Sequence, residues 1–442
     1  MVDFSIEPEF QAKLDWIKKF VDEKCMPLDY LFDYEASAPY DWRNKPLRRI
    51  VEKLQDEVKA QKLWACHLPP NLGGPGYGAV KLTYINELLG KCFFAPVVFG
   101  CQGPDSGNSE ILAMYGTPEQ KERYLKPLLA GEIFSCFSMT EPQGGSDPTN
   151  FTCSAVRDGD HWVINGEKWY SSHANHANFL IIMAVTNPEA ERHKRATMFI
   201  APVDSPGVEF AHHIGFFNEA YGVGGHPHMR YTNLRLPDSA RLGPVGEGFK
   251  VAQSRLGGGR LHHAQRTIGL CQHLLDMMGE RALSRYAFGG YISEKQSVQA
   301  DIANSYIELL QFRLQVLYTA WLFDQGLAEG REGRKAISAV KAAMAKVAND
   351  LVLRCLHLHG SIGLSNVMRF GPLLGVALHE GVADGPTEVH VDSVAKAVLR
   401  NYKRVEGNYP TEVLWERKAW AAKQLEPYLD PGVTLKDARA TL

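Results

Sequence analysis

The stretch "TCSAVRDGDHWVINGEKWY" (residues 152–170) decides the architecture of this chain, because it interrupts sequence that otherwise favours helices. It alternates short β-favouring runs with Asp158-Gly159 and Asn165-Gly166, dipeptides that tolerate positive φ and favour tight hairpins. Three more strand-like runs follow: "FLIIMAVT" (179–186), "ATMFIAPV" (196–203) and "MRYTNLRLP" (229–237). We therefore expect an antiparallel β domain over residues 136–245.

Helix-like sequence lies on both sides of this domain. Upstream, "PEQKERYLKPLLAGE" (118–132) begins with a proline, carries an apolar stripe and ends at a glycine, which predicts a helix. Downstream, residues 248–286 read as one long helix despite their glycines, and apolar residues at three- and four-residue steps lead to Gly360. The sequence thus predicts an α+β multidomain protein, with an N-terminal α-helical domain (1–135) and a C-terminal four-helix bundle (246–442).

Composition narrows the functional classes. The chain has 442 residues, 45% of them hydrophobic, and a formal net charge of −2, which gives no electrostatic reason to bind nucleic acid or an anionic membrane. No apolar run reaches the ~18 residues of a membrane span. The N-terminus carries early acids and resembles neither a secretory signal nor a transit peptide. Eight scattered cysteines without a CxxC pair favour buried, reduced thiols, so we expect a cytoplasmic protein.

Two stretches have the character of a binding site. "FSMTEPQGGSDPTN" (137–150) is a polar loop that its glycines open to close backbone approach by a flat or anionic ligand. "WYSS" (169–172) places a Trp face beside hydroxyl groups, which suits a planar heteroaromatic cofactor. Taken separately, each has an ordinary alternative: a surface turn for the first and a core Trp for the second.

Together these stretches resemble the acyl-CoA dehydrogenase family, whose pattern is a TEPxxGSD loop, a hairpin, and a strand with Trp and Thr or Ser. "MTEPQGGSD" (139–147) and "GEKWYSS" (166–172) match in order and spacing. "VGEGFKVAQ" (245–253), "SRYAFGGYISEKQSVQADIAN" (284–304) and "LHLHGSIGLS" (356–365) resemble later family segments. Ala-Asp-Gly-Pro (383–386) points to the branch of the family that carries this segment near the C-terminus.

The resemblance implies an FAD cofactor and a set of residues around it. Phe137, Met139 and Thr140 would lie along one side of the flavin ring, and Trp169 and Ser171 on the other. Gly145 and Ser146 belong to the same loop, with Ser146 near the phosphate or ribose part and also assigned to the substrate site. Pro386 and Glu388 follow the segment of the catalytic base, and Glu388 would point towards adenine.

The resemblance also implies that a neighbouring subunit completes each FAD site. Arg285, Phe288 and Gln296 would hold the pyrophosphate and adenine portion from that subunit, since an Arg side chain offers a bidentate donor fork to a diphosphate. The turn with His357, Gly360 and Ser361 would approach the same diphosphate, although His357 departs from the usual Gln. We therefore expect a homodimer or homotetramer.

In the family, a carboxylate removes a proton from Cα of an acyl thioester while the flavin takes a hydride from Cβ. Two acids could be the base here, Glu380 and Asp384. The helix phase of "DGPTEVHVDSVAK" (384–396) favours Asp384, and Glu380 keeps the ordinary interpretation of an acid at a helix start. Some relatives carry the base at the position of Gly259, which cannot serve. Arg260 and Gly385 are assigned to the substrate side of the site.

The expected reaction is dehydrogenation of an acyl-CoA, with electrons passed to an electron-transferring flavoprotein. A flavin oxidase of the nitroalkane oxidase type, which also uses an Asp, and a nucleic-acid-binding family member are the alternatives. His212-His213, His226 with His228, and His262-His263 lack zinc-site spacings, so we expect surface or packing roles and no metal. "RHKR" (192–195) is expected to form an exposed loop between strands, with a CoA phosphate contact as the alternative.

Overall fold

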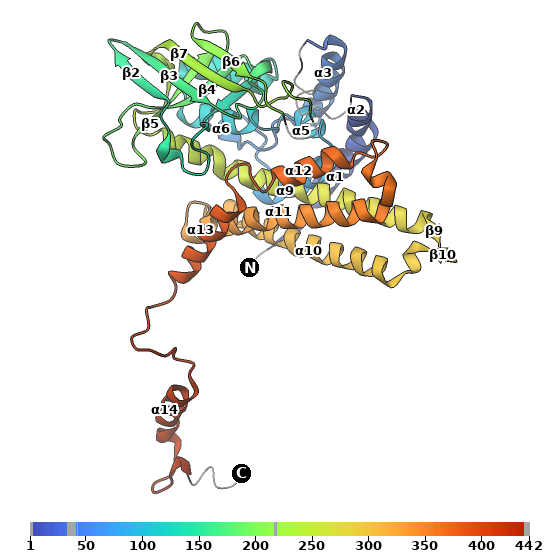
Figure 1. The fold of residues 1–442 in the computed structure, drawn as a ribbon, viewed down its shortest axis with the longest axis vertical. Coiled ribbons are helices and arrows are strands. Elements are labelled where there is room, and N and C mark those ends of the chain that lie inside the picture. The colour runs from blue at the N-terminus through green and yellow to red at the C-terminus, as the bar shows by residue number, and fades with distance from the viewer. Residues whose placement is uncertain (1–2, 33–40, 42, 216–218, 437–442) are drawn as a thin grey trace. The chain divides into compact units, whose positions relative to one another are not determined.

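The computed structural model describes residues 3–32, 41, 43–215 and 219–436. The chain divides into two compact units, Met1–Val394 and Ala395–Leu442. The first unit contains the helical, β-sheet and helical regions in the expected order (Figure 1), while the expected limits at 135/136 and 245/246 stay predictions. In the second unit, α14 (Leu414–Leu425) precedes a short 3₁₀ turn, and none of the described residues from 395 to 436 is buried.

The N-terminal region is helical, as predicted. Its helices are α1 (Pro8–Phe20), α2 (Met26–Leu31), α3 (Lys45–Ala60), α4 (Gly78–Leu89), α5 (Ala95–Val98), α6 (Asp105–Tyr115), α7 (Pro118–Gln120) and α8 (Lys126–Ala130). The helix expected over 118–132 begins with a capping box between Thr117 and Gln120 and passes through a π-helical turn. It ends before Gly131, whose φ of 78° suits a glycine.

The middle region forms one sheet of eight described strands. They are β1 (Ser135–Ser138), β2 (Ser154–Asp158), β3 (His161–Lys168), β4 (Phe179–Val185), β5 (Ala196–Pro202), β6 (Val208–His212), β7 (His228–Pro237) and β8 (Arg241–Leu242). The path runs β6-β7-β3-β2-β4-β5-β8, and β1 pairs with β4. The sheet is mixed rather than purely antiparallel, because β1 and β2 both pair with β4 in parallel.

One of the two predicted hairpin turns is wrong. Asp158-Gly159 does connect β2 to β3, but Asn165-Gly166 lies inside β3. There the pairing of β3 with β7 shifts register between Ile164 and Gly166, which marks a bulge. Gly166 has a φ of 141°, and a Cβ there would lie 2.6 Å from the Cys153 Cα atom. The glycine therefore permits close backbone approach within the sheet instead of a chain reversal.

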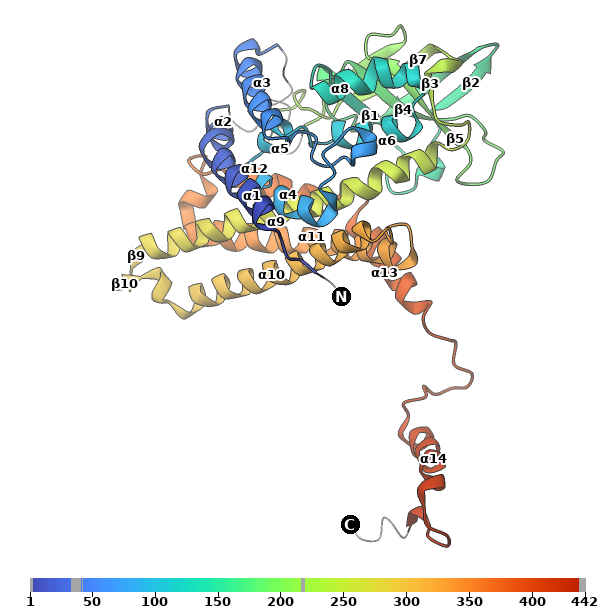
Figure 2. The ribbon, with the colours of Figure 1, turned by 180° about the vertical axis from the view of Figure 1, so that it is seen from behind.

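The C-terminal region is built on long helices, as predicted. They are α9 (Gly248–Ser284), α10 (Gln296–Asp324), α11 (Arg331–His359), α12 (Phe370–His379) and α13 (Thr387–Leu399). The short strands β9 (Tyr286–Ala287) and β10 (Gly290–Tyr291) form a hairpin between α9 and α10. Figures 1 and 2 show this hairpin at the end of the bundle, away from the sheet. Among the described residues, no helix is long and apolar enough to cross a membrane.

Helix α9 connects the three regions of the first unit. It packs against α4 and α6 of the N-terminal region, β5 of the sheet, and α10 and α11 of the bundle. Its interior glycines, which lower helix propensity, do not break it, because one face is buried along most of its length. Of the run Gly257–Gly259, Gly259 lines the cavity described next.

Candidate functional site

A cavity of about 1190 Å³ opens where the three regions meet. Its wall includes the loop before α6, the loop after β1, one face of α9, and the connection between α12 and α13. It brings together nine residues that the sequence assigned to cofactor, substrate or catalysis, from three segments more than a hundred positions apart: Phe137, Met139, Thr140, Gly145, Ser146, Arg260, Asp384, Gly385 and Pro386.

The residues of the "WYSS" segment (169–172) that line this cavity are not the two that the sequence interpretation placed beside the cofactor. Tyr170 and Ser172 line it, whereas Trp169 and Ser171 do not. The hydroxyl of Ser171 is buried and lies 2.8 Å from that of Ser138. The backbone N–H of Trp169 donates to the Thr140 carbonyl at 2.7 Å, so the two predicted cofactor segments are directly joined. The indole Nε1 of Trp169 is buried and has no hydrogen-bond partner among the described residues.

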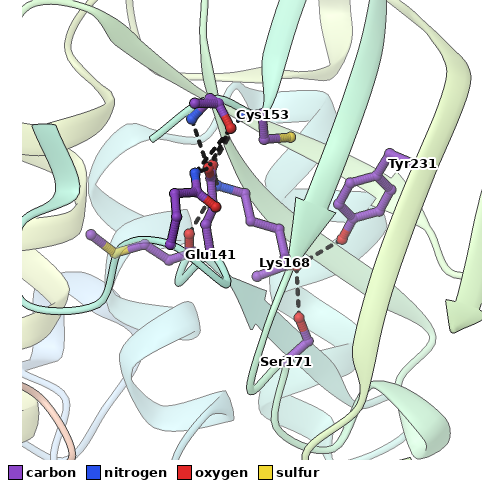
Figure 3. A network of polar contacts seen from close by, with 9 residues as sticks. Glu141, Cys153, Lys168, Ser171 and Tyr231 are labelled. Atoms are coloured by element: carbon purple, nitrogen blue, oxygen red, sulfur yellow. Dashed lines mark hydrogen bonds and ion pairs between the residues drawn. The ribbon is translucent and has the colours of Figure 1, made fainter. Parts of the chain in front are cut away.

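A buried ion pair supports the loop after β1. The Lys168 ammonium group donates to the Glu141 carboxylate at 2.7 Å and to the Met139 carbonyl at 2.8 Å (Figure 3). Glu141 also accepts hydrogen bonds from the backbone N–H groups of Thr152, at 2.6 Å, and Cys153, at 3.0 Å. Because both charged side chains are almost fully buried, this network fixes the loop that carries Met139 and Thr140 against the sheet.

Besides Trp169 and Ser171, seven further predicted cofactor residues lie outside the cavity. Arg285 and Phe288 lie at the β9–β10 hairpin and Gln296 begins α10, while His357, Gly360 and Ser361 lie at the end of α11. Arg281 connects the two groups by donating to the His359 carbonyl at 3.3 Å. The Phe288 side chain is 98% exposed and its φ is 52°. Glu388 is exposed on α13. The role predicted for the hairpin and turn in a neighbouring subunit's site stays a prediction.

Asp384 occupies a strained turn between α12 and α13, with a φ of 56°. Its backbone carbonyl accepts from Arg260 Nε at 2.9 Å and lies 3.3 Å from His390 Nε2. Its carboxylate approaches α9 where that helix has no side chain: a Cβ at Gly259 would lie 3.4 Å from Asp384 Oδ2. The two places where the family resemblance put a base, Gly259 and Asp384, therefore share one region of space.

Charges around Asp384 decide its ionisation. Burial raises the pKa of this carboxyl group, but His263, Arg255, Arg260 and Lys341 together outweigh burial and leave the pKa below its ordinary value. Asp384 is consequently ionised at neutral pH, which is the state that a proton acceptor needs. The same neighbours that keep it ionised also make it a weaker base.

Glu380 is not an acid at a helix start, so that interpretation is wrong. It follows the C-terminal end of α12, is only 6% exposed, and lines the cavity. Its Oε1 lies 3.2 Å from His263 Nδ1, and its other oxygen has no hydrogen-bond partner among the described residues. Burial raises the pKa of Glu380, but His263, His379 and Lys341 overcome burial and lower it to about 2. Glu380 is therefore a buried, ionised carboxylate close to Asp384.

His226, His228 and His262 are buried, which agrees with packing roles. The structure adds that His226, His262, His263 and His379 line the cavity. The sequence held one signal for His263: it lies four residues after Gly259 and so shares its face of α9. His212 and His213 are exposed, as expected. In the described part of the chain, no group of His, Cys, Asp and Glu is arranged to hold a metal ion.

Arg255 is a further residue that the sequence interpretation missed. Its guanidinium lies 4.1 Å from the Phe137 ring centroid, and its Nε donates to Asn108 Oδ1 at 2.9 Å. It lines the same cavity as Asp384, whose ionised form its charge favours. Nothing in the local sequence distinguishes Arg255 from other helical arginines, because its neighbours come from α6 and β1.

The loop 192–195 lies between β4 and β5, as expected. Arg192 Nη2 lies 3.1 Å from Asp147 Oδ2, and the His193 ring stacks on Phe249 with centroids 4.3 Å apart. Arg192 and His193 line the same cavity as Ser146. A cationic side chain is thus available at this part of the cavity, while the phosphate contact itself stays a prediction.

The cysteine prediction is confirmed. All eight thiols are buried and none forms a disulfide. Their burial raises the pKa of several of them, for example that of Cys153 to about 11, which disfavours reactive thiolates.

Comparison with family models matches three consecutive segments of the chain. They are the N-terminal domain of acyl-CoA dehydrogenase (residues 7–132), its middle domain (136–232) and its C-terminal domain (246–399). The segment after residue 399, which contains α14, lies beyond these matches.

Among curated proteins, acyl-CoA dehydrogenase family member 10 of Mus musculus is 36% identical over 410 residues, which are 91% of this chain and 38% of that protein. The chain thus spans about half or less of the length of several curated relatives it matches. The probable acyl-CoA dehydrogenase FadE2 of Mycobacterium tuberculosis is 38% identical over 378 residues, covering 84% of this chain and 90% of that protein.

Solved structures show the same fold. A Mycobacterium abscessus chain with a provisional acyl-CoA dehydrogenase assignment superposes with a TM-score of 0.82 at 35% identity, covering 90% of this chain and 100% of its own. A glutaryl-CoA dehydrogenase of Mycobacterium smegmatis, solved in complex with FADH2, has a TM-score of 0.72 at 23% identity, covering 91% of this chain and 97% of its own. The second likeness supports the fold alone.

Proposed function

The chain belongs to the acyl-CoA dehydrogenase family, and from this premise we propose that it oxidises an acyl-CoA thioester to the trans-2-enoyl-CoA with FAD. One observation carries the proposal: the carboxylate of Asp384 opens into the same cavity as the loop Phe137–Ser146. A proton acceptor and a Gly-opened polar loop in one large cavity match a reaction that needs a base beside a planar cofactor.

The residues present fit FAD. The buried Trp169 Nε1 has no acceptor among the described residues, and Gly145 leaves open space, since a Cβ there would meet only Thr140 Cγ2 at 4.0 Å. Phe137, Met139 and Thr140 supply an apolar and hydroxyl-bearing wall next to these groups. When bound, FAD supplies the acceptor for the hydride that leaves Cβ. Trp169 and Ser171 support this wall through their hydrogen bonds to Thr140 and Ser138, and the ring contact that the family resemblance implies for them stays a prediction.

Asp384 is proposed to take the α-proton through its carboxylate. Arg260 holds the Asp384 carbonyl, so the strained turn keeps the base in place before the substrate arrives. Gly385, next to the base, is assigned to the thioester through its backbone N–H, which stabilises charge that develops on the thioester oxygen. The apolar faces of Phe137 and Met139 exclude water from the reacting carbon.

A neighbouring copy is proposed to complete the site. Arg285, Phe288 and Gln296 do not face this chain's own cavity, and the exposed Phe288 ring has the character of an interface residue. A homodimer or homotetramer would use these residues, together with the turn at His357–Ser361, on the cofactor of the adjacent subunit. An electron-transferring flavoprotein is the proposed acceptor of the electrons.

The first prediction tests this function by flavin absorbance. The purified protein is expected to be yellow and to bleach without oxygen when butyryl-, octanoyl- or palmitoyl-CoA is added. Asp384→Asn should keep FAD and lose bleaching by at least ~10²-fold, because the proton acceptor is gone. Glu380→Gln is the matched control and should still bleach.

Three outcomes would contradict the proposal or part of it. Protein that cannot be reconstituted with FAD would contradict the whole proposed function. Bleaching that survives Asp384→Asn but not Glu380→Gln would transfer the base to Glu380. Stoichiometric hydrogen peroxide formed without another acceptor would identify an oxidase instead.

A further inference from the structure

His263 lies between the two buried carboxylates of the α12–α13 connection. Its Nδ1 is 3.2 Å from Glu380 Oε1, and its Nε2 is 3.9 Å from Asp384 Oδ2. The side chains of His263, Glu380 and Asp384 are 25%, 8% and 21% exposed respectively, so they form a largely enclosed row from Glu380 to Asp384. Each ring nitrogen of one imidazole thus faces a different carboxylate.

This arrangement fixes what each nitrogen can do. A neutral imidazole donates from one nitrogen and accepts at the other, and the partner of the donor decides which is which. Glu380 is ionised and can only accept, so it holds the proton on Nδ1. The lone pair of Nε2 then points towards Asp384. A partner carboxylate that orients a histidine in this way is known to matter at catalytic and metal sites.

We propose that His263 is a positioning residue for the base, and that it takes from Asp384 the proton removed from the substrate, while Glu380 fixes its orientation. The inference rests on the proposed function of Asp384. In the first step the Cα–H bond breaks and an O–H bond forms at Asp384, and the electron pair left on Cα would form the Cα=Cβ bond as the hydride leaves Cβ in the proposed reaction. In the second that O–H bond breaks and an N–H bond forms at His263 Nε2, and the carboxylate is restored. The 3.9 Å separation requires a shift of the Asp384 side chain or one bridging water.

Groups from four elements face this row and bear on its titration. His262, Arg255 and Arg260 come from α9 and Lys341 from α11. The His379 ring, at the end of α12, lies 6.0 Å from that of His263, and His390 on α13 approaches the Asp384 carbonyl. Lys341 donates a hydrogen bond to the backbone carbonyl of Glu380, which holds the backbone of that residue in place. His263 is the first of the groups that lower the pKa of both carboxylates, ahead of Arg255, Arg260 and Lys341 at Asp384, and it is the group that lies between the two.

The second prediction uses stopped-flow bleaching of the reconstituted holoenzyme with octanoyl-CoA, followed by steady-state turnover with a ferrocenium acceptor. His263→Gln should lower kcat by ~10-fold or more with KM changed little, since proton removal from Asp384 occurs after binding. The acidic limb of the pH dependence of the bleaching rate should also move to higher pH, because His263 lowers the pKa of Asp384 and its loss raises that pKa. Glu380→Gln should lower kcat and shift the acidic limb in the same directions but by less. Glu380→Asp should recover part of the kcat that Glu380→Gln loses.

His273→Gln is the matched control, since His273 is on the same helix outside the cavity, and it should behave as wild type. Unchanged kcat and an unshifted limb in His263→Gln would overturn the proposal. A second readout does not depend on activity: ¹⁵N-histidine NMR should show the Nδ1–H form for His263, lost in Glu380→Gln. An NMR spectrum that shows the Nε2–H form of His263 would also overturn the proposal. Wild-type holoenzyme that fails to bleach with any acyl-CoA would instead contradict the proposed function, and the NMR result would still decide the orientation of His263.

Discussion

At the scale of single residues, the short side chain of Asp384 is matched by its surroundings. An Asp carboxylate lies one methylene closer to the backbone than a Glu carboxylate, and misplacement by about 1 Å can cost ~10²-fold in rate. Here the turn with positive φ brings the carboxylate to α9 at Gly259, where no side chain occupies the space. The strained turn at Asp384 and the missing side chain at Gly259 therefore depend on each other. A larger residue at position 259 or 384 would compete for the same volume.

The third prediction concerns the buried Lys168–Glu141 pair. Lys168→Met leaves the Glu141 carboxylate buried without its cation, and removal of one partner from such a pair costs ~3–5 kcal/mol. We expect a loss of this size in the free energy of unfolding, measured by urea denaturation, together with weaker FAD retention. Lys126→Met is the control, because its pair with Glu122 is 72% exposed on both sides and should contribute less than ~1 kcal/mol. Equal losses in the two variants would contradict a structural role for the buried network.

At the scale of elements, α9 does more than support the bundle. It carries Arg255, Gly259, Arg260 and His263 on the face that borders the cavity, while its other faces pack on α4, α10 and α11. A single helix thus supplies Arg255 and Arg260 beside Asp384 and the space that Asp384 needs, while Lys341 comes from α11. The segment between α12 and α13 brings Glu380 and Asp384 to this face, and the backbone carbonyls of both residues are held by cations, from Lys341 and Arg260 respectively.

The fourth prediction concerns the β9–β10 hairpin. Phe288→Ser should weaken FAD binding by ~10-fold or more and favour smaller assemblies, because an exposed aromatic side chain at an interface often contributes more than ~1 kcal/mol. The FAD-to-protein ratio on dilution and light scattering after gel filtration measure the two effects. Val156→Ser on β2 removes another exposed apolar side chain, 64% exposed, and should leave both unchanged. Full FAD binding by a Phe288→Ser monomer would show that the hairpin serves no neighbouring subunit.

At the scale of the whole molecule, the chain consists of one large compact unit and a small second one. The large unit ends at Val394, and the family match ends at residue 399, so α14 belongs to neither. Several large apolar side chains of the second unit are exposed, among them Trp415 and Trp420. The catalytic proposal depends on the first unit alone, since every residue that lines the cavity precedes residue 394.

The fifth prediction follows from this division. Limited trypsin digestion should cut first after Arg400, Lys403 or Arg404, because the segment between α13 and α14 is exposed and has no regular structure. The remaining core should keep FAD and its acyl-CoA bleaching, as followed by mass spectrometry and absorbance. Earlier cleavage inside residues 43–215, or loss of FAD together with α14, would contradict the independence of the two units.

The sequence by itself determined the order of the three regions, the family and nine residues of the cavity, because hydrophobic periodicity and short motifs are local properties of the chain. It also indicated Asp384 over Glu380 from the phase of α13. It misjudged Asn165-Gly166, since one dipeptide suits both a hairpin turn and a bulge, and only the pairing of β3 with β7 distinguishes the two. Only the tertiary structure decided that Glu380 is a buried ionised acid, that His263 lies between two carboxylates, and that Arg255 lies over Phe137. Those relations join residues separated by 117 or more positions, and burial and charge at such a meeting point depend on the packing of several elements at once.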